Sequence, residues 1–315
     1  MALPNELEAL TKAFSGHGVE ENSLISILGK SHPEHRRGFR KNCSQFFIQD
    51  ERQFERWNDV YVKLLKQEFM RFKNAVVLWT MHPWERDARL IKEALVEGPH
   101  QYGVIVEVAC TRSAEELLGA RRAYHSLFDH SVEEDVATHI HGSQRKLLVA
   151  LVSAYRYEGP EVKEHAVKSD ATILSHAIDS ANKHKLIEDE EVVRILTTRS
   201  KLHLKEVFQY YNHIPGKSII KDLAGDDFLL EETVECLYTP HTYFAKVLES
   251  ALKIDADKNA KKAVTRVIVS RADTDVKEIN EEYHKQFGVS LEKKIKDTAK
   301  GNYRDFLLSL LAKGN

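Results

Sequence analysis

An internal repeat constrains this chain most, because repeated units of this length predict a set of similar supersecondary modules. Three segments begin with an apolar helix end and an arginine, and each has a tyrosine 12 residues later and an apolar residue 24 residues later. These positions are Arg112, Tyr124 and Val136, then Arg199, Tyr211 and Leu223, then Arg271, Tyr283 and Ile295. Each copy closes with an apolar helix after a glycine, as in GSQRKLLVALV. A lone copy could not bury its apolar faces, so the copies should pack together.

The first segment follows the same pattern more loosely. Phe47 stands where Phe128 and Phe287 stand in other copies, Ser31 takes the arginine position, and an insertion of roughly ten residues follows. The sequence therefore predicts an all-α chain of four repeats of about 70 residues, each a bundle of about five short helices. The expected boundaries are 1–80, 81–155, a linker at 156–168, 169–241 and 242–315.

Composition agrees with a helical chain and excludes several classes of protein. There are 7 prolines and 14 glycines in 315 residues, and 30% of the residues are charged, which favours helix. The net charge of −2 provides no general basic field for nucleic acid, so an anionic partner requires a local site or a bridging cation. Three cysteines without CxxC spacing argue against a zinc site and a disulfide framework, and favour a reducing compartment.

One short loop has the composition of a cation site. Residues 14–21 read FSGHGVEE, between two segments with helical periodicity. Two glycines at this spacing could turn backbone carbonyls inward around a hard cation, with carboxylates close by. The alternative is a solvated loop in which Glu20 and Glu21 favour the positive end of the next helix.

The four repeats together resemble the annexin family, and the segments ERDARLIKEAL and TRSAEELLGARRAYHSLF are similar to its plant branch. The resemblance extends from about residue 3 to 312. It implies a slightly curved all-α disc whose convex face docks calcium and acidic phospholipid. In that family each calcium lies in a GxGT-type loop that supplies three carbonyl oxygens, and a carboxylate about 40 residues later completes the site. A calcium ion with vacant positions can bridge a near-neutral protein to an anionic bilayer.

The first repeat keeps the family loop best. By resemblance Phe14, Gly16 and Gly18 supply the carbonyls, while Val19 replaces the usual threonine. Glu68 is the expected capping carboxylate, displaced to 50 residues after Gly18 by the insertion near residues 50–60. Glu21 is the candidate for a second, weaker calcium ion on the same loop.

The other three loops depart further from the family pattern. The second repeat has lost the glycine pair, and His139 stands near its capping position. The third has Ile187 and Glu188 in the turn, with Asp226 or Asp227 as the capping residue. In the fourth, the carbonyl positions fall on Leu252, Ile254 and Ala256, with Asp297 as the nearest cap; without glycine the tight turn is harder to form. We expect sites in the first repeat and, less completely, in the fourth.

Four charged residues match positions that the family places along a central polar channel: Asp87, Glu107, Arg112 and Arg266. A conducting role is one interpretation, and interior salt bridges between helices are the other. Cys110 and Cys236 match cysteines for which plant members have suggested redox roles. Each ends an apolar helix, so a buried thiol that packs as a small apolar group is the alternative.

Enzymatic alternatives have little support in the sequence. The GKS triplets at 29–31 and 216–218 lack the first glycine of a phosphate-binding loop, because Leu24 and Tyr211 stand there. HExxH and GxSxG motifs are absent. The peroxidase-like activity suggested for some plant members depends on a histidine near position 30, where this chain has Lys30, with His32 and His35 nearby.

The expected partner is an acidic phospholipid surface, reached through Ca²⁺ as the cofactor. A scaffold that binds actin or another protein with little use of calcium is an alternative, and self-association on membranes is a further expectation of the resemblance. The N-terminal residues carry no secretory signal, and the longest apolar stretch, Ala75–Trp79, is too short to cross a bilayer. These features predict a cytoplasmic protein that is peripheral on membranes when calcium rises.

Overall fold

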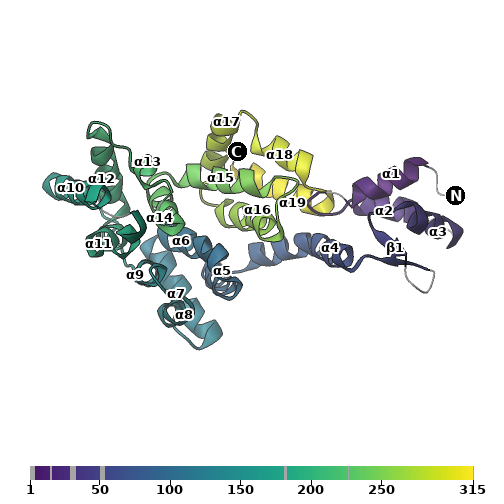
Figure 1. The fold of residues 1–315 in the computed structure, drawn as a ribbon, viewed down its shortest axis with the longest axis horizontal. Coiled ribbons are helices and arrows are strands. Elements are labelled where there is room, and N and C mark those ends of the chain that lie inside the picture. The colour runs from purple at the N-terminus through teal and green to yellow at the C-terminus, as the bar shows by residue number, and fades with distance from the viewer. Residues whose placement is uncertain are drawn as a thin grey trace. The chain divides into compact units, whose positions relative to one another are not determined.

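The computed structural model describes residues 4–14, 16–28, 33–49, 54–180, 183–225 and 227–314. These residues form nineteen α-helices, three short 3₁₀ helices and one two-stranded sheet (Figure 1). The chain divides into two units, one made of Met1–Thr80 with Phe244–Asn315 and the other of Met81–Tyr243. The first and last repeats therefore share one unit, and the two middle repeats share the other.

The first repeat begins with three short helices, α1 (Pro4–Ala13), α2 (Glu21–Leu28) and α3 (Pro33–Asn42). An antiparallel hairpin follows, β1 (Phe47–Gln49) and β2 (Glu55–Trp57), in which Phe47 is opposite Trp57. Aromatic rings fill the core between these elements, and Phe46 lies edge-on to Phe14 with 5.7 Å between ring centroids. The residues inserted relative to the other repeats thus build a hairpin with its own aromatic core, which the sequence analysis did not anticipate.

One long helix, α4 (Asp59–Thr80), completes the first repeat with 22 residues. In the other repeats a glycine with positive φ stands at or just before the start of the last helix: Gly142, Gly225 and Gly301. The first repeat has no glycine between Gly38 and Gly98, and nothing in this stretch breaks the helix. The first repeat therefore has four helices and a hairpin where five helices were expected.

The last repeat completes the same unit with five helices and packs directly on the first. Contacts join α16 and α19 to α4, and α19 to α2. The elements are α15 (Pro240–Ala251), α16 (Lys258–Arg271), α17 (Val276–Phe287), α18 (Leu291–Thr298), α19 (Gly301–Leu311) and the 3₁₀ helix η3 (Ala312–Gly314).

The other unit holds two repeats of five α-helices each, joined by the segment that precedes α10. Within it α6 packs on α14, and α9 on α11. Its elements are α5 (Pro83–Glu97), η1 (Pro99–Gln101), α6 (Tyr102–Thr111), α7 (Ala114–Phe128), α8 (Val132–His139), α9 (Gln144–Ser153), α10 (Glu164–Ser180), η2 (Lys183–Glu188), α11 (Glu190–Thr198), α12 (Lys201–His213), α13 (Ile219–Leu223) and α14 (Phe228–Tyr238). The expectation of an all-α chain of repeats is confirmed.

The repeated tyrosines have one structural role in all three copies. Tyr124, Tyr211 and Tyr283 are fully buried, and each hydroxyl donates to a carboxylate: Tyr124 to Asp135 at 2.6 Å, Tyr211 to Asp222 at 2.9 Å, and Tyr283 to Glu249. A buried hydroxyl needs such a partner, because an unsatisfied polar group in the core is costly. The 12-residue spacing seen in the sequence therefore marks a repeated hydrogen bond from a buried tyrosine to a carboxylate.

Candidate functional site

The loop between α1 and α2 contains two glycines with left-handed backbone angles. Gly16 has φ of 89° and Gly18 has φ of 86°, a region that residues with a Cβ rarely adopt. A Cβ on Gly16 would also lie 2.8 Å from the carbonyl oxygen of Thr298, and one on Gly18 would lie 2.8 Å from that of Lys300. The turn and the close approach of the backbone between α18 and α19 both require glycine here.

The residue between the two glycines holds the loop to that backbone. The amide of His17 donates to the Thr298 carbonyl at 3.0 Å, and the amide of Lys300 donates to the His17 carbonyl at 2.6 Å. Within the described part of the chain, no hydrogen bond reaches the three neighbouring carbonyls that were predicted to bind calcium. The loop therefore alternates between a carbonyl that is hydrogen-bonded to a distant segment and carbonyls that accept no hydrogen bond from the described residues.

The ring of His17 is fully buried and ties the loop to the last repeat. Its Nε2 lies 2.9 Å from the carbonyl oxygen of Ala251 at the end of α15. Burial lowers the pKa of His17 to about 4, so the ring is neutral at neutral pH. The sequence analysis missed this residue, because only the fold places Ala251 beside the loop.

Glu68 meets the loop across 50 residues of chain, as the sequence predicted. Its Oε2 accepts a hydrogen bond from the Gly18 amide at 2.6 Å. The same oxygen accepts one from Nε of Arg71 at 2.6 Å, and both side chains are buried. The other oxygen, Oε1, is buried with no hydrogen-bond partner among the described residues. Arg71 was not anticipated, and it supplies a positive charge beside the carboxylate expected to cap calcium.

The two carboxylates that end the loop face the start of α19. Oε1 of Glu20 accepts a hydrogen bond from the Gly301 amide at 3.0 Å and lies 3.5 Å from Nη1 of Arg304. Glu21 is the first residue of α2, where a negative charge is favourable. Glu20 therefore stabilises the N-terminus of another helix, and Glu21 has the helix-start position named as the alternative to a second calcium site.

The fourth-repeat loop places its predicted ligands in different environments. Leu252 is fully buried, whereas Ile254 is 76% exposed. The amide of Ala256 donates to the Lys253 carbonyl at 3.2 Å, which closes a tight turn. Asp297 is exposed on α18, and within the described residues no hydrogen bond or ion pair joins it to this loop. Carbonyl and carboxylate oxygens that share a cation are all acceptors and form no hydrogen bond with one another, so this set stays a prediction.

Polar side chains at the predicted sites of the middle repeats form hydrogen bonds with the backbone of their own helices. Nδ1 of His139 is 2.8 Å from a backbone carbonyl one turn earlier in α8. Ile187 is buried and Glu188 exposed, both in η2. Asp227 caps the N-terminus of α14 through the Leu229 amide at 2.9 Å, and Asp226 lies outside the described residues. Across the described ranges, no group of three or more His, Cys, Asp or Glu side chains is placed to hold a metal ion.

The four charges expected in the interior are divided between the two units. Arg112 and Asp87 form a bidentate pair, with Nε to Oδ2 at 2.7 Å and Nη2 to Oδ1 at 2.8 Å, and both side chains are almost fully buried. Burial acts to lower the pKa of Arg112, but the Asp87 carboxylate raises it above its ordinary value. Glu107 is fully buried in the same unit, and Arg266 is half-buried in the other.

All three cysteines are buried free thiols. Burial raises the pKa of Cys110 to about 11 and raises that of Cys236 well above its usual value. Burial also raises the pKa of Cys43. Thiols protected in this way are poor nucleophiles and weak redox sensors, because the thiolate is the reactive form.

We expect the native protein to show no rapid thiol reaction with a chromogenic disulfide reagent at about pH 8, because both burial and a raised pKa suppress the thiolate. In denaturant all three cysteines should react. The measurement is the absorbance of the coloured thiolate that the reagent releases, recorded before and after addition of urea. A fast reaction of Cys110 or Cys236 in the folded protein would instead support a redox role.

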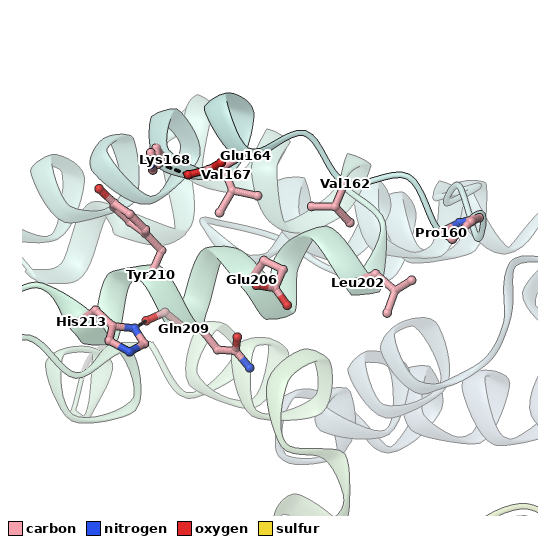
Figure 2. Close-up of a pocket in the computed structure, with 10 residues that line it drawn as sticks. All are labelled: Pro160, Val162, Glu164, Val167, Lys168, Leu202, Glu206, Gln209, Tyr210 and His213. Carbon is pink, nitrogen blue, oxygen red and sulfur yellow. Dashed lines mark hydrogen bonds and ion pairs between the residues drawn. The ribbon is translucent and has the colours of Figure 1, made fainter.

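The middle-repeat unit has a surface cavity of about 780 Å³ beside the segment between α9 and α10 (Figure 2). Glu164 and Lys168 pair one turn apart on α10 along one wall, and Nδ1 of His213 lies 2.7 Å from the Gln209 carbonyl. Its lining includes no serine, threonine or cysteine, so it lacks a nucleophile and base pair of the usual kind. The lining residues are Pro160, Val162, Glu164, Val167, Lys168, Leu202, Glu206, Gln209, Tyr210 and His213.

None of the helices in the described part of the chain has the length and apolar character needed to span a bilayer. The residues of the expected peroxidase position, Lys30 and His32, and the first GKS triplet lie outside the described residues.

Comparison with known proteins agrees with the repeat pattern. The profile of the family described as Annexin matches residues 86–151, 169–227 and 243–310. Annexin D4 of Arabidopsis thaliana is 56% identical over all of both chains, and Annexin-like protein RJ4 of Fragaria ananassa is 41% identical over 98% of this chain and 95% of that protein. The structure of chicken annexin V superimposes with a TM-score of 0.67 at 27% identity, covering 99% of this chain and 97% of that one. The chain therefore belongs to the annexin family, whose members in general bind phospholipid in a calcium-dependent way and are typically not enzymes.

Proposed function

We propose that this protein binds acidic phospholipid membranes in a calcium-dependent way, chiefly through the first-repeat loop. The single observation that supports this assignment most is the contact between the Glu68 carboxylate and the Gly18 amide, which brings the expected capping residue to the expected loop. Family membership supports the general activity, and this contact supports the choice of loop.

The chemistry of the donor set fits a hard cation. Calcium takes six to eight oxygen ligands, and the loop offers the carbonyls of Phe14, Gly16 and Gly18, which accept no hydrogen bond from the described residues. Glu68 adds a carboxylate whose Oε1 is buried without a partner among those residues. A site built this way leaves ligand positions for water and for a lipid phosphate.

Calcium at this loop has to compete with an internal cation. The Arg71 guanidinium lies 2.6 Å from Glu68 and is buried with it, so the carboxylate is already neutralised without calcium. Binding of the ion therefore requires Arg71 to move away or to share the carboxylate. We infer that Arg71 lowers the calcium affinity of this site relative to a loop capped by an unpaired carboxylate.

The remaining loops are expected to contribute less. In the fourth repeat we retain a low-affinity site at Leu252, Ile254 and Ala256, with Asp297 as the nearest cap. Glu21 is a further candidate ligand on the first loop. We propose no site in the second and third repeats, where the GxG pair is missing from the turn and local hydrogen bonds use the polar groups.

The test is sedimentation with vesicles of phosphatidylserine and phosphatidylcholine. We expect the protein to pellet with them at millimolar calcium, because the ion bridges loop carbonyls and lipid phosphate, and we expect much of this pelleting to be lost in chelator. Vesicles of phosphatidylcholine alone are the control. Pelleting that is indifferent to calcium would contradict the proposal and would support the scaffold alternative, for which actin co-sedimentation is the corresponding assay.

We also propose structural roles for the interior charges and the repeat boundaries. Asp87 and Arg112 are paired within one unit, which supports an interior salt bridge over an ion pathway. We keep the proposed repeats at 81–155, 169–241 and 242–315 with the linker at 156–168. Helix α5 begins at Pro83, just inside its repeat, whereas α10 begins at Glu164 within the proposed linker and α15 begins at Pro240, two residues before the proposed last repeat. A cytoplasmic protein that becomes peripheral on membranes as calcium rises is the location that fits this proposed activity.

A further inference from the structure

The outward side of α4 combines lysines with large apolar side chains. Six exposed residues form this surface, which we call the outer face: Lys63, Lys66, Phe69, Met70, Lys73 and Val77. At 3.6 residues per turn they fall within an arc of about 120° and extend along about 21 Å of helix. The buried residues of α4, Leu65, Glu68, Arg71 and Ala75, fall on the opposite side.

The outer face is basic, although the whole chain has a net charge of −2. The two acidic residues of α4 are Asp59 at its first position, which pairs with Arg56 at 3.1 Å, and the buried Glu68. Lys63, Lys66 and Lys73 form no ion pair with any residue that the structure describes. Three lysine charges therefore stand on this face with no acidic side chain of α4 exposed between them.

The apolar residues on this face are large and exposed. Phe69 and Met70 are each 45% exposed and Val77 is 51% exposed. Single exposed apolar residues are ordinary, but a helix face that combines them with lysines has the composition of helices that lie in a membrane interface. The lysine ammonium groups can reach lipid phosphates while the apolar side chains enter the boundary of the acyl chains.

We propose that the outer face of α4 is a docking surface for an anionic phospholipid bilayer that works without calcium. The face is positively charged and apolar, which complements a bilayer surface carrying phosphatidylserine. Because α4 is continuous from Asp59 to Thr80 (Figure 1), all six side chains are held by one rigid helix. This contact is separate from the calcium loops, so it can hold when those sites are empty.

The experiment measures vesicle binding in chelator at low ionic strength. We expect the full-length protein to bind phosphatidylserine vesicles and to bind phosphatidylcholine vesicles far less. Replacement of Lys63, Lys66 and Lys73 by glutamine should weaken this binding on the order of 100-fold, from about five-fold for each lysine near an anionic surface. Added salt should weaken it as well. No binding in chelator would overturn the proposal.

Two further variants separate the outer face from general charge. Glutamine at the exposed lysines Lys205, Lys221 and Lys277, on α12, α13 and α17, makes the same change in net charge and should leave binding unchanged. An equal loss in that variant would overturn the proposal. The change Phe69→Ser, which keeps every lysine, should also reduce vesicle binding.

The size of the protein in solution tests whether the outer face binds lipid or a second copy of the chain. A dimer that Phe69→Ser dissociates would assign the face to a second copy of the chain and would overturn a lipid contact. Calcium-dependent pelleting is measured separately on the same glutamine variant. If it persists, only the calcium-independent contact has been removed. If calcium does not increase the pelleting of the unaltered protein, the loop proposal fails independently of this one.

Discussion

Replacing Arg112 with methionine is expected to destabilise the unit of the middle repeats by about 3–5 kcal/mol, the usual cost of leaving one member of a buried pair without its partner. Asp87 would keep its negative charge in an almost fully buried position without the guanidinium that neutralises it. The measurement is urea unfolding followed by circular dichroism, with hydrogen exchange of the α5 and α6 amides to assign the loss to this unit.

Helix α5, which carries Asp87, also offers a matched control. Arg89 pairs with Glu85 at 2.8 Å on α5, but both side chains are solvent-accessible. Arg89→Met should therefore change the free energy of unfolding by less than about 1 kcal/mol. If the two variants lose the same stability, the buried pair is not a major structural tie. The double variant Asp87→Leu with Arg112→Met should recover much of the loss, because an apolar pair leaves no buried charge.

These variants also separate the two interpretations of the interior charges. A structural tie predicts lower stability in Arg112→Met with no change in ion flux across a protein-loaded bilayer. A conducting role predicts altered flux at a temperature where the variant remains folded. The bidentate geometry favours the first result, since each guanidinium proton aimed at Asp87 already has an acceptor.

Replacing Arg71 with glutamine is expected to make the stability of the other unit strongly calcium-dependent. Without calcium, Glu68 would be a buried carboxylate held mainly by the Gly18 amide, at a cost of about 3–5 kcal/mol. Calcium at about 100 times its dissociation constant would restore about 2.7 kcal/mol. Thermal melts in chelator and in millimolar calcium measure both changes, and titration calorimetry counts the ions bound.

The double variant Glu68→Gln with Arg71→Gln is the control for that experiment. It has neither charge, so its melting temperature in chelator should exceed that of Arg71→Gln, and its calcium response at this loop should be absent. If Arg71→Gln responds to calcium no more than the unaltered protein does, Glu68 is not a calcium ligand. The general activity of the family would then have to come from another loop.

Local spacing was enough to predict the all-α fold and the repeat. The spacing of 12 residues from each arginine to a tyrosine follows helix periodicity within one repeat. It marks a hydrogen bond such as that from Tyr124 to Asp135. The pairing of Glu68 with the first loop was also accessible, because the family pattern places a carboxylate about 40 residues after the loop and the insertion near residues 50–60 explains the longer spacing here. In the structure the Gly18 amide donates to Glu68, and the role of Glu68 as a calcium cap stays a prediction.

The nature of the first-repeat site could not be read from the sequence. The absence of glycine between Gly38 and Gly98 is visible there, and the spacing of three residues already makes Glu68 and Arg71 neighbours on a helix. Only the folded chain shows that α4 continues unbroken and that this pair is buried against the loop. The same continuity creates the outer face, because lysines and apolar residues join one surface only when a single helix carries them.

The sequence by itself determined the helical class, the four repeats, the family resemblance and the glycine loop with its distant carboxylate. All of these depend on residue type and on spacing within a repeat. The tertiary structure decided which groups of that loop already form hydrogen bonds with distant parts of the chain. The His17 ring contacts the carbonyl of Ala251, 234 residues away, and the backbone amide of Lys300 donates a hydrogen bond to the His17 carbonyl. Periodicity reports which face of a helix is buried, whereas the partner on that face depends on how distant repeats pack.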